Sequence, residues 1–537
     1  MEQFKISEKN VLGCILEENA KLMGDKTFLI YEDNEISYKQ LNLTVNKIAN
    51  GFLNLGIKNG DKVAIMMENC LEFIYTWFAL SKIGAIEVPI NFFHKGEVLK
   101  YLINYSDAEI LVLSGAYIRQ IKKIENDLTN IKLALIDPLS PEPRLKKFAI
   151  EPYNSLLNNP ATPPEINVKY NDLMAILFTS GTTGISKGVM LTHNQMIFQG
   201  YMYVYTCGIT NEDRMYHYLP LFHEAGQCGG TLAPLIAKGT IILKKSFSAT
   251  KFWDEIREYK ITKTGGFEPI VRILHKAPPQ ENDGDHLLRV FVCGHVPPDI
   301  HEDFQNRFNV KLIDAYGMTE TDMSISATLN DIKIGSCGKA HTQYFEVKLF
   351  DEYDMEVPIG TPGEIAIRPL LPYIVMEGYY KMPEYTLRAF KNLWFHTGDL
   401  VYKDENGFYY FVDRKKDMVR RAGENVSSKE VEEIINSHES IKECAVVGVK
   451  DEIVGEEIKV AIVLKRGKSV LPQELIEYCD KRMAYFMVPR YIEFLEELPK
   501  QLDGQKIIKE KLKDINSNTW DRKKAGIKLK REKEKNN

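Results

Sequence analysis

Thr179-Ser180-Gly181-Thr182-Thr183-Gly184-Ile185-Ser186-Lys187-Gly188 is rich in hydroxyl groups and glycine, and it directly follows the apolar run from Leu173 to Phe178. The apolar run predicts a strand that leads into a loop. Glycines let backbone N–H groups point inward, the hydroxyls add donors, and Lys187 supplies a positive charge. We therefore expect a phosphate cradle. The chain contains no Walker A pattern, G-x-x-x-x-G-K-[ST], which disfavours a P-loop nucleotidase.

A composition rich in glycine and threonine is by itself typical of a flexible surface loop. The segments on both sides instead favour a loop that is fixed between regular elements. Gly188 to Leu191 predicts a second strand. Thr192 and Gln195 then have the spacing of a capping box, in which each side chain bonds the backbone of the other, at the start of a helix. The loop is thus expected between regular elements.

Composition excludes several classes of protein. The chain has 537 residues, 44% of them apolar and 27% charged, which is an ordinary globular composition for more than one domain. A formal net charge of -5 provides no overall attraction to nucleic acid. The eight cysteines form no C-x-x-C pair, so we expect neither a zinc site nor a redox motif, but reduced thiols in a cytoplasmic protein.

No membrane segment is expected. Met1 to Lys5 lacks the charged and then apolar layout of a signal peptide. The most apolar run, Phe73 to Phe93, contains charged residues and a proline, which is too much for a membrane span. We predict instead a buried helix from Glu72 to Ile83 that leads through Gly84 into a buried strand.

The pattern along the chain predicts an α/β fold with two domains. Short β-rich runs alternate with helix-like segments from Gly60 to Val310, which is typical of sheets covered by helices. Near residue 400 short strands and Gly/Asp-rich turns take over, and the polar stretch Asp413 to Asp417 resembles a linker. Beyond it, Ser427 and Glu430 have the spacing that starts a helix, Ala445–Val449 and Ile458–Leu464 predict strands, and Pro472 starts another helix.

We therefore expect a large N-terminal domain over residues 1–415 and a small α+β domain over residues 416–520, joined by a hinge. Residues 521–537 form a basic tail that we expect to be disordered, with eight Lys/Arg against two Glu between Arg522 and Lys535.

Four spaced motifs together resemble the adenylate-forming, or AMP-binding, superfamily, which includes acyl-CoA synthetases, luciferases and peptide-synthetase adenylation domains. They are the loop at Thr179–Gly188, Tyr316-Gly317-Met318-Thr319-Glu320, Phe395-His396-Thr397-Gly398-Asp399, and the stretch from Asp413 to Glu432. Four motifs in the family's order are much more specific than any one of them. Within the superfamily the chain is most similar to crotonobetaine/carnitine–CoA ligases and fatty-acid–CoA ligases.

The resemblance implies a site for ATP, Mg²⁺ and coenzyme A. Glu320 would be the ligand of Mg²⁺, which prefers hard oxygens. Tyr316 would offer a flat ring to the adenine, and Asp399, in a glycine turn, would bind the ribose with Arg414. The residues implied for nucleotide and coenzyme A binding are Thr179, Ser180, Gly181, Thr182, Thr183, Gly184, Lys187, Gly294, His295, Val296, Asp314, Ala315, Tyr316, Gly317, Met318, Asp399, Arg414 and Gly423.

Each of these residues alone has a plainer interpretation. A tyrosine such as Tyr316 is usually a core residue, Asp399 could simply form a turn, and a single carboxylate such as Glu320 is mostly solvated. The sequence also departs from the family at Ser186, where proline is usual, and at His295 and Val296, where small residues are usual.

For catalysis the resemblance implies Lys506, His223 and Thr319. Lys506 would bond the incoming carboxylate and the α-phosphate, and His223 would lie at the carboxylate end of the acyl pocket. Lys506 follows Gln505 where the family has glycine, and it stands one place farther from Pro499 than expected, so Lys509 remains the alternative. Lys416 occupies the position of the hinge.

The implied function is an ATP-dependent acid–CoA ligase, which forms acyl-AMP and pyrophosphate and then transfers the acyl group to CoA. The substrate would be a betaine such as crotonobetaine or carnitine, or a short or medium-chain fatty acid. Two further alternatives are an adenylation domain that loads a carrier protein and a nucleotide-binding homologue with impaired catalysis. The expected partners are therefore a small carboxylic acid, ATP and CoA.

Overall fold

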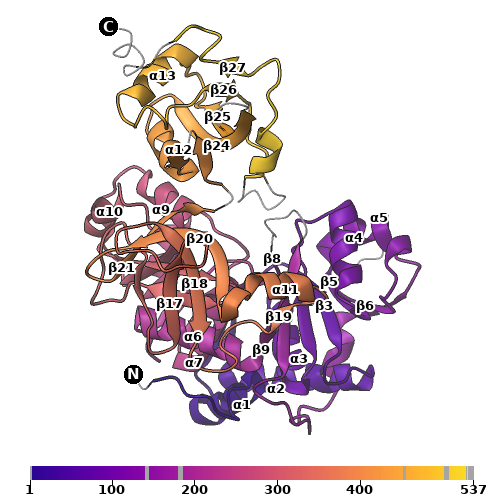
Figure 1. Cartoon of the computed structure of the whole chain (residues 1–537). Helices are drawn as coiled ribbons and strands as arrows, with labels where there is room; N and C mark the ends of the chain where they lie inside the picture. Colours follow the sequence, from indigo (N-terminus) through magenta and orange to yellow (C-terminus); the bar gives the residue numbers. More distant parts are fainter. Residues whose placement is uncertain are drawn as a thin grey trace. The chain divides into compact units, whose positions relative to one another are not determined.

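The computed structural model describes residues 3–138, 144–179, 186–415, 417–421, 424–451, 455–500, 507–527 and 529. The chain divides into two compact units (Figure 1). The first comprises Met1–Val347, Ile367–Phe395 and Asn406–Tyr409, and the second comprises Lys348–Ala366, His396–Glu405 and Tyr410–Asn537. The expected α/β fold with a larger N-terminal part and a smaller second part is confirmed. The predicted domain border at residue 415 stays a prediction.

One sheet of the first unit carries the loop that opens the sequence analysis. Its strands are β3 (Lys62–Met66), β4 (Ile86–Pro89), β5 (Ile110–Ser114), β6 (Leu133–Asp137), β7 (Ala149–Pro152), β8 (Leu173–Thr179), β9 (Lys187–Thr192) and β19 (Gly378–Tyr379). They follow the order β19-β9-β8-β4-β3-β5-β6-β7. The pairs from β8 to β7 are parallel, whereas β8 and β9 form an antiparallel pair.

Helices cover this sheet because its strands are apolar on both faces. The helices are α1 (Leu12–Met23), α2 (Tyr38–Asn54), α3 (Leu71–Ile83), α4 (Gly96–Tyr105) and α5 (Ile118–Ile124). Leu102 of α4 and Ile121 of α5 share a core with Met66 of β3. The predicted apolar helix is confirmed as α3, and Gly84 ends it at φ 72°, a left-handed conformation that glycine adopts without strain.

A second sheet of the first unit runs in the order β16-β15-β14-β13-β12-β10-β11-β1-β2. Its strands are β1 (Thr27–Tyr31), β2 (Asn34–Ser37), β10 (Arg214–His217), β11 (Thr240–Leu243), β12 (Lys263–Phe267), β13 (Val290–Gly294), β14 (Lys311–Met318), β15 (Asp322–Ser326) and β16 (Gly338–Ala340). From β1 to β14 the pairs are parallel, and β15 and β16 add antiparallel pairs.

Both faces of this sheet are also covered. The helices are α6 (His193–Cys207), α7 (Ala233–Ala237), α8 (Phe252–Glu258), α9 (Glu268–His275) and α10 (His301–Phe308), with a π-helix at Ala225–Leu232. Helix α11 (Pro383–Ala389) instead contacts β19 of the first sheet. Side chains alternate along β13, since Phe291 packs in the core with α8, α9 and α10 while Val292 packs with α6 and α7. The sheet is therefore doubly covered, as the alternating pattern predicts.

The second unit contains the α+β part. Strands β17 (Phe345–Phe350), β18 (Gly363–Pro369), β20 (Phe395–Lys403) and β21 (Phe408–Arg414) follow one another in space, and each has residues in both units. A six-stranded sheet follows, with β22 (Val419–Arg421), β23 (Glu424–Val426), β24 (Ile441–Asp451), β25 (Gly455–Leu464), β26 (Tyr491–Phe494) and β27 (Trp520–Asp521). Helices α12 (Ser428–Asn436) and α13 (Pro472–Asp480) share a core with it. The predicted cap is confirmed, because Ser427 Oγ accepts a hydrogen bond from Glu430 N–H at 3.2 Å.

The start of the basic tail differs from the expected disorder. Asp521 pairs with Tyr491 across β26 and β27, and the side chain of Arg522 is 1% exposed. Arg522 N–H donates to the carbonyl of Arg490 at 2.9 Å, and Leu529 is buried in the core of the sheet. The number of charges in this segment predicts disorder, but it does not show that the Arg522 side chain can be buried. A guanidinium can be buried when backbone carbonyls accept its hydrogen bonds.

Candidate active site

The two ends of the predicted phosphate loop lie on paired strands. Thr179 ends β8 and stands opposite Lys187, which begins β9, and Thr179 Oγ1 donates to the carbonyl of Lys187 at 3.5 Å. The calls on Ser180, Gly181, Thr182, Thr183 and Gly184 lie outside the described residues. The hairpin fixes where the loop leaves and re-enters the sheet, and it brings Lys187 to that point.

Lys187 lies between two aromatic rings. Its Nζ is 4.8 Å from the ring centroid of Tyr379 and 4.8 Å from that of Tyr385. Burial lowers the pKa of the Lys187 ammonium, and the nearby carboxylate of Glu320 acts in the opposite direction. The Lys187 ammonium is thus partly desolvated, so an anionic ligand would displace little water when it binds there.

Glu320 is a buried carboxylate held by a tyrosine that the sequence analysis misses. It is 5% exposed, and Tyr379 OH donates to its Oε1 at 2.8 Å. Burial, together with the carboxylate of Glu320, raises the pKa of the Tyr379 phenol, so the hydroxyl keeps its proton and remains a donor. The interpretation of Glu320 as a solvated surface group is thereby excluded.

The donor set around Glu320 fits Mg²⁺ only when the phosphates contribute ligands. Within the described ranges, no three Asp, Glu, His or Cys side chains gather in a way that could hold a metal ion. Magnesium commonly uses one or two carboxylates with substrate phosphates and water. A single oriented carboxylate near Lys187 suits that mode of binding.

Two glutamines of α6 support the segment that carries Thr319. Thr192 Oγ1 accepts from Gln195 N–H at 3.1 Å, so half of the predicted capping box is confirmed. The other half is wrong, because Gln195 Nε2 instead lies 3.4 Å from the carbonyl oxygens of Thr319 and Glu320. Gln199 Nε2 also donates to the Thr319 carbonyl at 3.4 Å. The glutamines thus position this turn.

Strands β13 and β14 bring most of the predicted nucleotide wall together. Asp314 is paired with Cys293 in register, and Asp314 Oδ2 accepts from Val296 N–H at 2.8 Å. This bond closes the turn after β13, in which His295 has φ 66°. Tyr316 is 9% exposed in β14. Gly294, Ala315, Gly317 and Met318 line one cavity.

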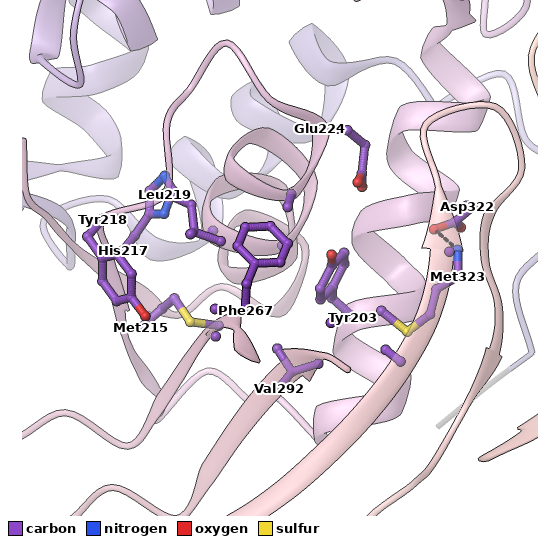
Figure 2. A pocket seen from close by; sticks show the side chains of 18 of the residues that line it. Tyr203, Met215, His217, Tyr218, Leu219, Glu224, Phe267, Val292, Asp322 and Met323 are labelled. Carbon is purple, nitrogen blue, oxygen red and sulfur yellow. Dashed lines mark hydrogen bonds between the residues drawn. The ribbon is translucent and has the colours of Figure 1, made fainter. Parts of the chain in front are cut away.

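That cavity lies within the first unit and has a volume of about 140 Å³ (Figure 2). Its wall combines several glycines with larger side chains, among them Tyr203, His217, Glu224, Phe267, Asp322 and Met323. For comparison, an apolar cavity of about 150 Å³ in another protein takes up benzene. The space therefore suits a small ligand group and not a long acyl chain.

His223 is exposed, and its N–H donates to the carbonyl of Pro220 at 3.0 Å. The residue that reaches the cavity wall is its neighbour, Glu224, which the sequence analysis misses. A π-helix, Ala225–Leu232, begins directly after it, and such irregular turns are frequent at functional sites. Gly230 lets this helix approach the sheet, because a Cβ at that position would lie 2.2 Å from Nδ1 of His217.

Glu224 and Asp322 are two acidic groups in the same apolar cavity. Burial raises the pKa of Glu224 to about 7. Burial, and next the neighbouring Glu224, raise the pKa of Asp322 well above its ordinary range. A positive charge in the cavity would oppose both effects. The signal available in the sequence was weak, since the two residues are far apart in the chain. Glu224 directly follows His223, and Asp322 stands two places after Glu320.

In the second unit, Asp399 and Arg414 form an ion pair across β20 and β21. Arg414 Nε lies 3.2 Å from Asp399 Oδ1, and Asp399 is 5% exposed. The predicted glycine turn is wrong, because Gly398, with φ 75°, lies inside β20 and distorts the strand without ending it. The two residues that the resemblance implies for the ribose are thus brought together.

The predicted linker begins with a structural residue. Asp413 is 4% exposed, and its Oδ2 accepts from Ser428 N–H at 2.6 Å and from Ser428 Oγ at 2.9 Å. It therefore anchors the start of α12, and a polar run alone could not distinguish this from a loose linker. Lys416 and Gly423 lie outside the described residues.

Of the two candidate lysines, Lys509 lies among the described residues and Lys506 lies outside them. Lys509 Nζ is 2.8 Å from Glu432 Oε1 and donates to Ser428 Oγ at 2.6 Å, all within the second unit. Burial raises the pKa of Glu432 in spite of this pairing. Lys509 thus serves the packing of α12, and Lys506 stays the preferred candidate for catalysis.

Comparisons with known proteins agree with this arrangement. The family model for the AMP-binding enzyme matches residues 16–380, and the one for the AMP-binding enzyme C-terminal domain matches residues 430–504. The chain belongs to the AMP-binding enzyme family. A crotonobetaine/carnitine–CoA ligase of Shigella dysenteriae serotype 1 is 37% identical over 519 residues, which cover 93% of this chain and 98% of that protein.

Solved structures with the same fold include a CoA ligase. An anthranilate CoA ligase, AuaEII, in complex with anthranoyl-AMP has a TM-score of 0.83 and 26% identity, over 94% of this chain and 96% of that one. ATP-bound MatB from Rhodopseudomonas palustris has a TM-score of 0.83 and 27% identity, over 94% and 98%. The chain is accordingly an AMP-forming acid–CoA ligase that uses ATP, Mg²⁺ and CoA. Across the residues that the structure describes, no helix is both long and apolar enough to cross a membrane.

Proposed function

We propose that this acid–CoA ligase activates a small betaine, of the crotonobetaine or carnitine type. The observation that carries the proposal is the cavity of about 140 Å³, whose wall includes Ala315, Gly317 and Met318 of the predicted nucleotide site. An acid bound there would present its carboxylate beside the nucleotide. The 37% identity to a crotonobetaine/carnitine–CoA ligase favours a betaine over other small acids.

Each predicted site residue receives a role in the proposal. The phosphate loop with Lys187 would hold the triphosphate, Tyr316 the adenine, and Asp399 with Arg414 the ribose. Glu320 would hold Mg²⁺, which bridges phosphate oxygens and offsets their charge. Lys506, His223 and Thr319 would act on the reacting groups, and Gly423 would let the pantetheine arm of CoA pass. The nucleotide wall would comprise Gly294, His295, Val296, Asp314, Ala315, Gly317 and Met318.

The reaction would proceed in two steps. A carboxylate oxygen attacks the α-phosphorus of ATP, the bond to pyrophosphate breaks, and acyl-AMP forms. The sulfur of CoA then attacks the acyl carbon, AMP leaves, and a thioester results. Orientation and charge stabilisation suffice for both steps, so no serine or cysteine nucleophile is needed.

The domain roles are also part of the proposal. Residues 416–520 would turn about Lys416 between the two steps and so present two different faces to the site on residues 1–415. The cysteines are all free thiols, which suits the reducing environment of the cytoplasm, where we place the protein.

A panel of acids tests the proposal. The purified protein is incubated with ATP, Mg²⁺, CoA and one acid, and AMP release and acyl-CoA mass are measured. γ-Butyrobetaine, crotonobetaine and carnitine are compared with butyrate, hexanoate and octanoate. We expect the highest kcat/KM with a betaine. A preference for hexanoate or octanoate would support a fatty-acid ligase, and absence of pyrophosphate exchange with every acid would support an impaired homologue.

A further inference from the structure

The cavity contains two carboxyl groups with no basic partner. Glu224 immediately precedes the π-helix at Ala225–Leu232, and Asp322 begins β15. Throughout the described part of the chain, no Lys, Arg or His side chain forms an ion pair with either of them. Figure 2 shows the Glu224 side chain directed toward Tyr203, with Asp322 to the right of them in the view.

Asp322 is one of the residues that line the cavity, and its carboxyl group has an unused acceptor. The residue is 2% exposed, and one carboxylate oxygen accepts from the backbone N–H of Met323. Its Oδ2 is buried and has no hydrogen-bond partner among the described residues. A buried polar atom without a partner costs folding free energy, and a ligand that pairs with it would remove that cost.

The rest of the wall suits an organic cation better than a metal ion. Magnesium and calcium require about six oxygen ligands, whereas here two carboxyl groups share the wall with Tyr203, Phe267 and the thioether of Met323. Aromatic faces attract large, weakly hydrated cations. A quaternary ammonium group could contact the carboxyl groups and the aromatic rings at once.

We infer that Glu224, Asp322 and Tyr203 form the subsite that binds the cationic end of the acid, and that they determine specificity for a zwitterionic substrate. This inference rests on the proposed function and extends it.

The test compares a cationic acid with its uncharged twin. γ-Butyrobetaine and 5,5-dimethylhexanoate have the same shape, because a carbon replaces the nitrogen. Dissociation constants are measured by calorimetry, and kcat/KM by AMP release. The variants are Glu224→Gln and Asp322→Asn. Asparagine tolerates the φ of 64° at residue 322, so the second variant keeps the backbone.

A matched control is Glu87→Gln, which removes a fully buried carboxyl group that lies outside the cavity wall. We expect the wild-type protein to favour the betaine, and each cavity variant to weaken its binding by about 10-fold to 100-fold, as for the loss of one charged contact. Binding of 5,5-dimethylhexanoate should be unchanged or tighter in both variants. The control should leave the ratio of the two acids as in the wild type.

The outcomes separate the two proposals. Loss of betaine preference in both folded variants supports the cation subsite, even if no acyl-CoA is formed and the proposed function fails. Equal binding of both acids by the wild type, no binding of either, or a preference that survives both substitutions would overturn it. In that last case the ligase function with a betaine would still stand. Thermal unfolding of each variant shows whether it is folded.

Discussion

The Tyr379→Phe substitution should weaken the use of Mg²⁺ while leaving the acid pocket unchanged. Tyr379 OH donates to Oε1 of Glu320 at 2.8 Å, and Glu320 is 5% exposed. Phenylalanine keeps the ring and therefore its contact with Lys187, but it removes the bond that orients the carboxylate. Loss of a partner that orients a metal ligand typically lowers metal affinity about 10-fold to 100-fold.

This effect corresponds to about 1.4 to 2.7 kcal/mol, which agrees with about 1.5 to 3 kcal/mol for a hydrogen bond to a charged group. Adenylation is measured as pyrophosphate release against Mg²⁺ concentration at fixed ATP, and binding of Mg·ATP by calorimetry. The half-saturating Mg²⁺ concentration should rise by that factor, with KM for the acid unchanged.

Tyr380→Phe is the matched control. Its hydroxyl donates to Asp107 Oδ2 at 2.7 Å, so the variant loses the same atom and also a bond to a carboxylate. It should cost stability without shifting the Mg²⁺ dependence. If Tyr379→Phe shifts that dependence no more than Tyr380→Phe does, the assignment of Glu320 as a metal ligand held by Tyr379 is refuted.

Three further predictions concern the lysine, the acid sensitivity and the π-helix. Lys506→Ala should abolish adenylation but leave thioester formation from supplied acyl-AMP largely intact; normal pyrophosphate release by this variant would show that another residue is catalytic. Burial acts to raise the pKa of Glu364, but hydrogen bonds with His396 and Lys415 lower it from 4.5 to about 2. About 3 kcal/mol of stability should therefore be present above pH 4.5 and lost as the pH falls toward 2, and Glu364→Gln should flatten this dependence in urea unfolding at each pH. Gly230→Ala places a methyl group 2.2 Å from Nδ1 of His217, so it should cost about 1 to 3 kcal/mol of unfolding free energy, and an unchanged melting temperature would contradict the close packing.

Local patterns in the sequence predict the elements of the fold well. The apolar run that becomes α3, the glycine that ends it and the serine that caps α12 each act through neighbours in the chain. The same holds for the two strands that flank the phosphate loop. Interactions between residues close together in the chain determine these features, so the sequence alone contains all the partners in one short segment.

The site residues that were missed depend on partners far away in the chain. Tyr379 is 59 positions from Glu320, and nothing near either one indicates the bond between them. Glu224 and Asp322 meet only because the π-helix and β15 border one cavity. Gln195 fits a capping pattern, yet its side chain turns to the carbonyl of Thr319, since tertiary contacts compete with local ones.

The antiparallel pairing of β8 with β9 also limits how this protein can change during evolution. Lys187 is the first residue of β9, and its side chain points to one face because alternate residues of a strand point to opposite faces. Lengthening the connection before Lys187 leaves that orientation intact. Removing one residue within β9 would instead shift the pairing and turn every following side chain over. The strand itself must therefore keep its length, whereas an insertion before Lys187 is limited by the spacing of the phosphate loop and not by the strand pairing.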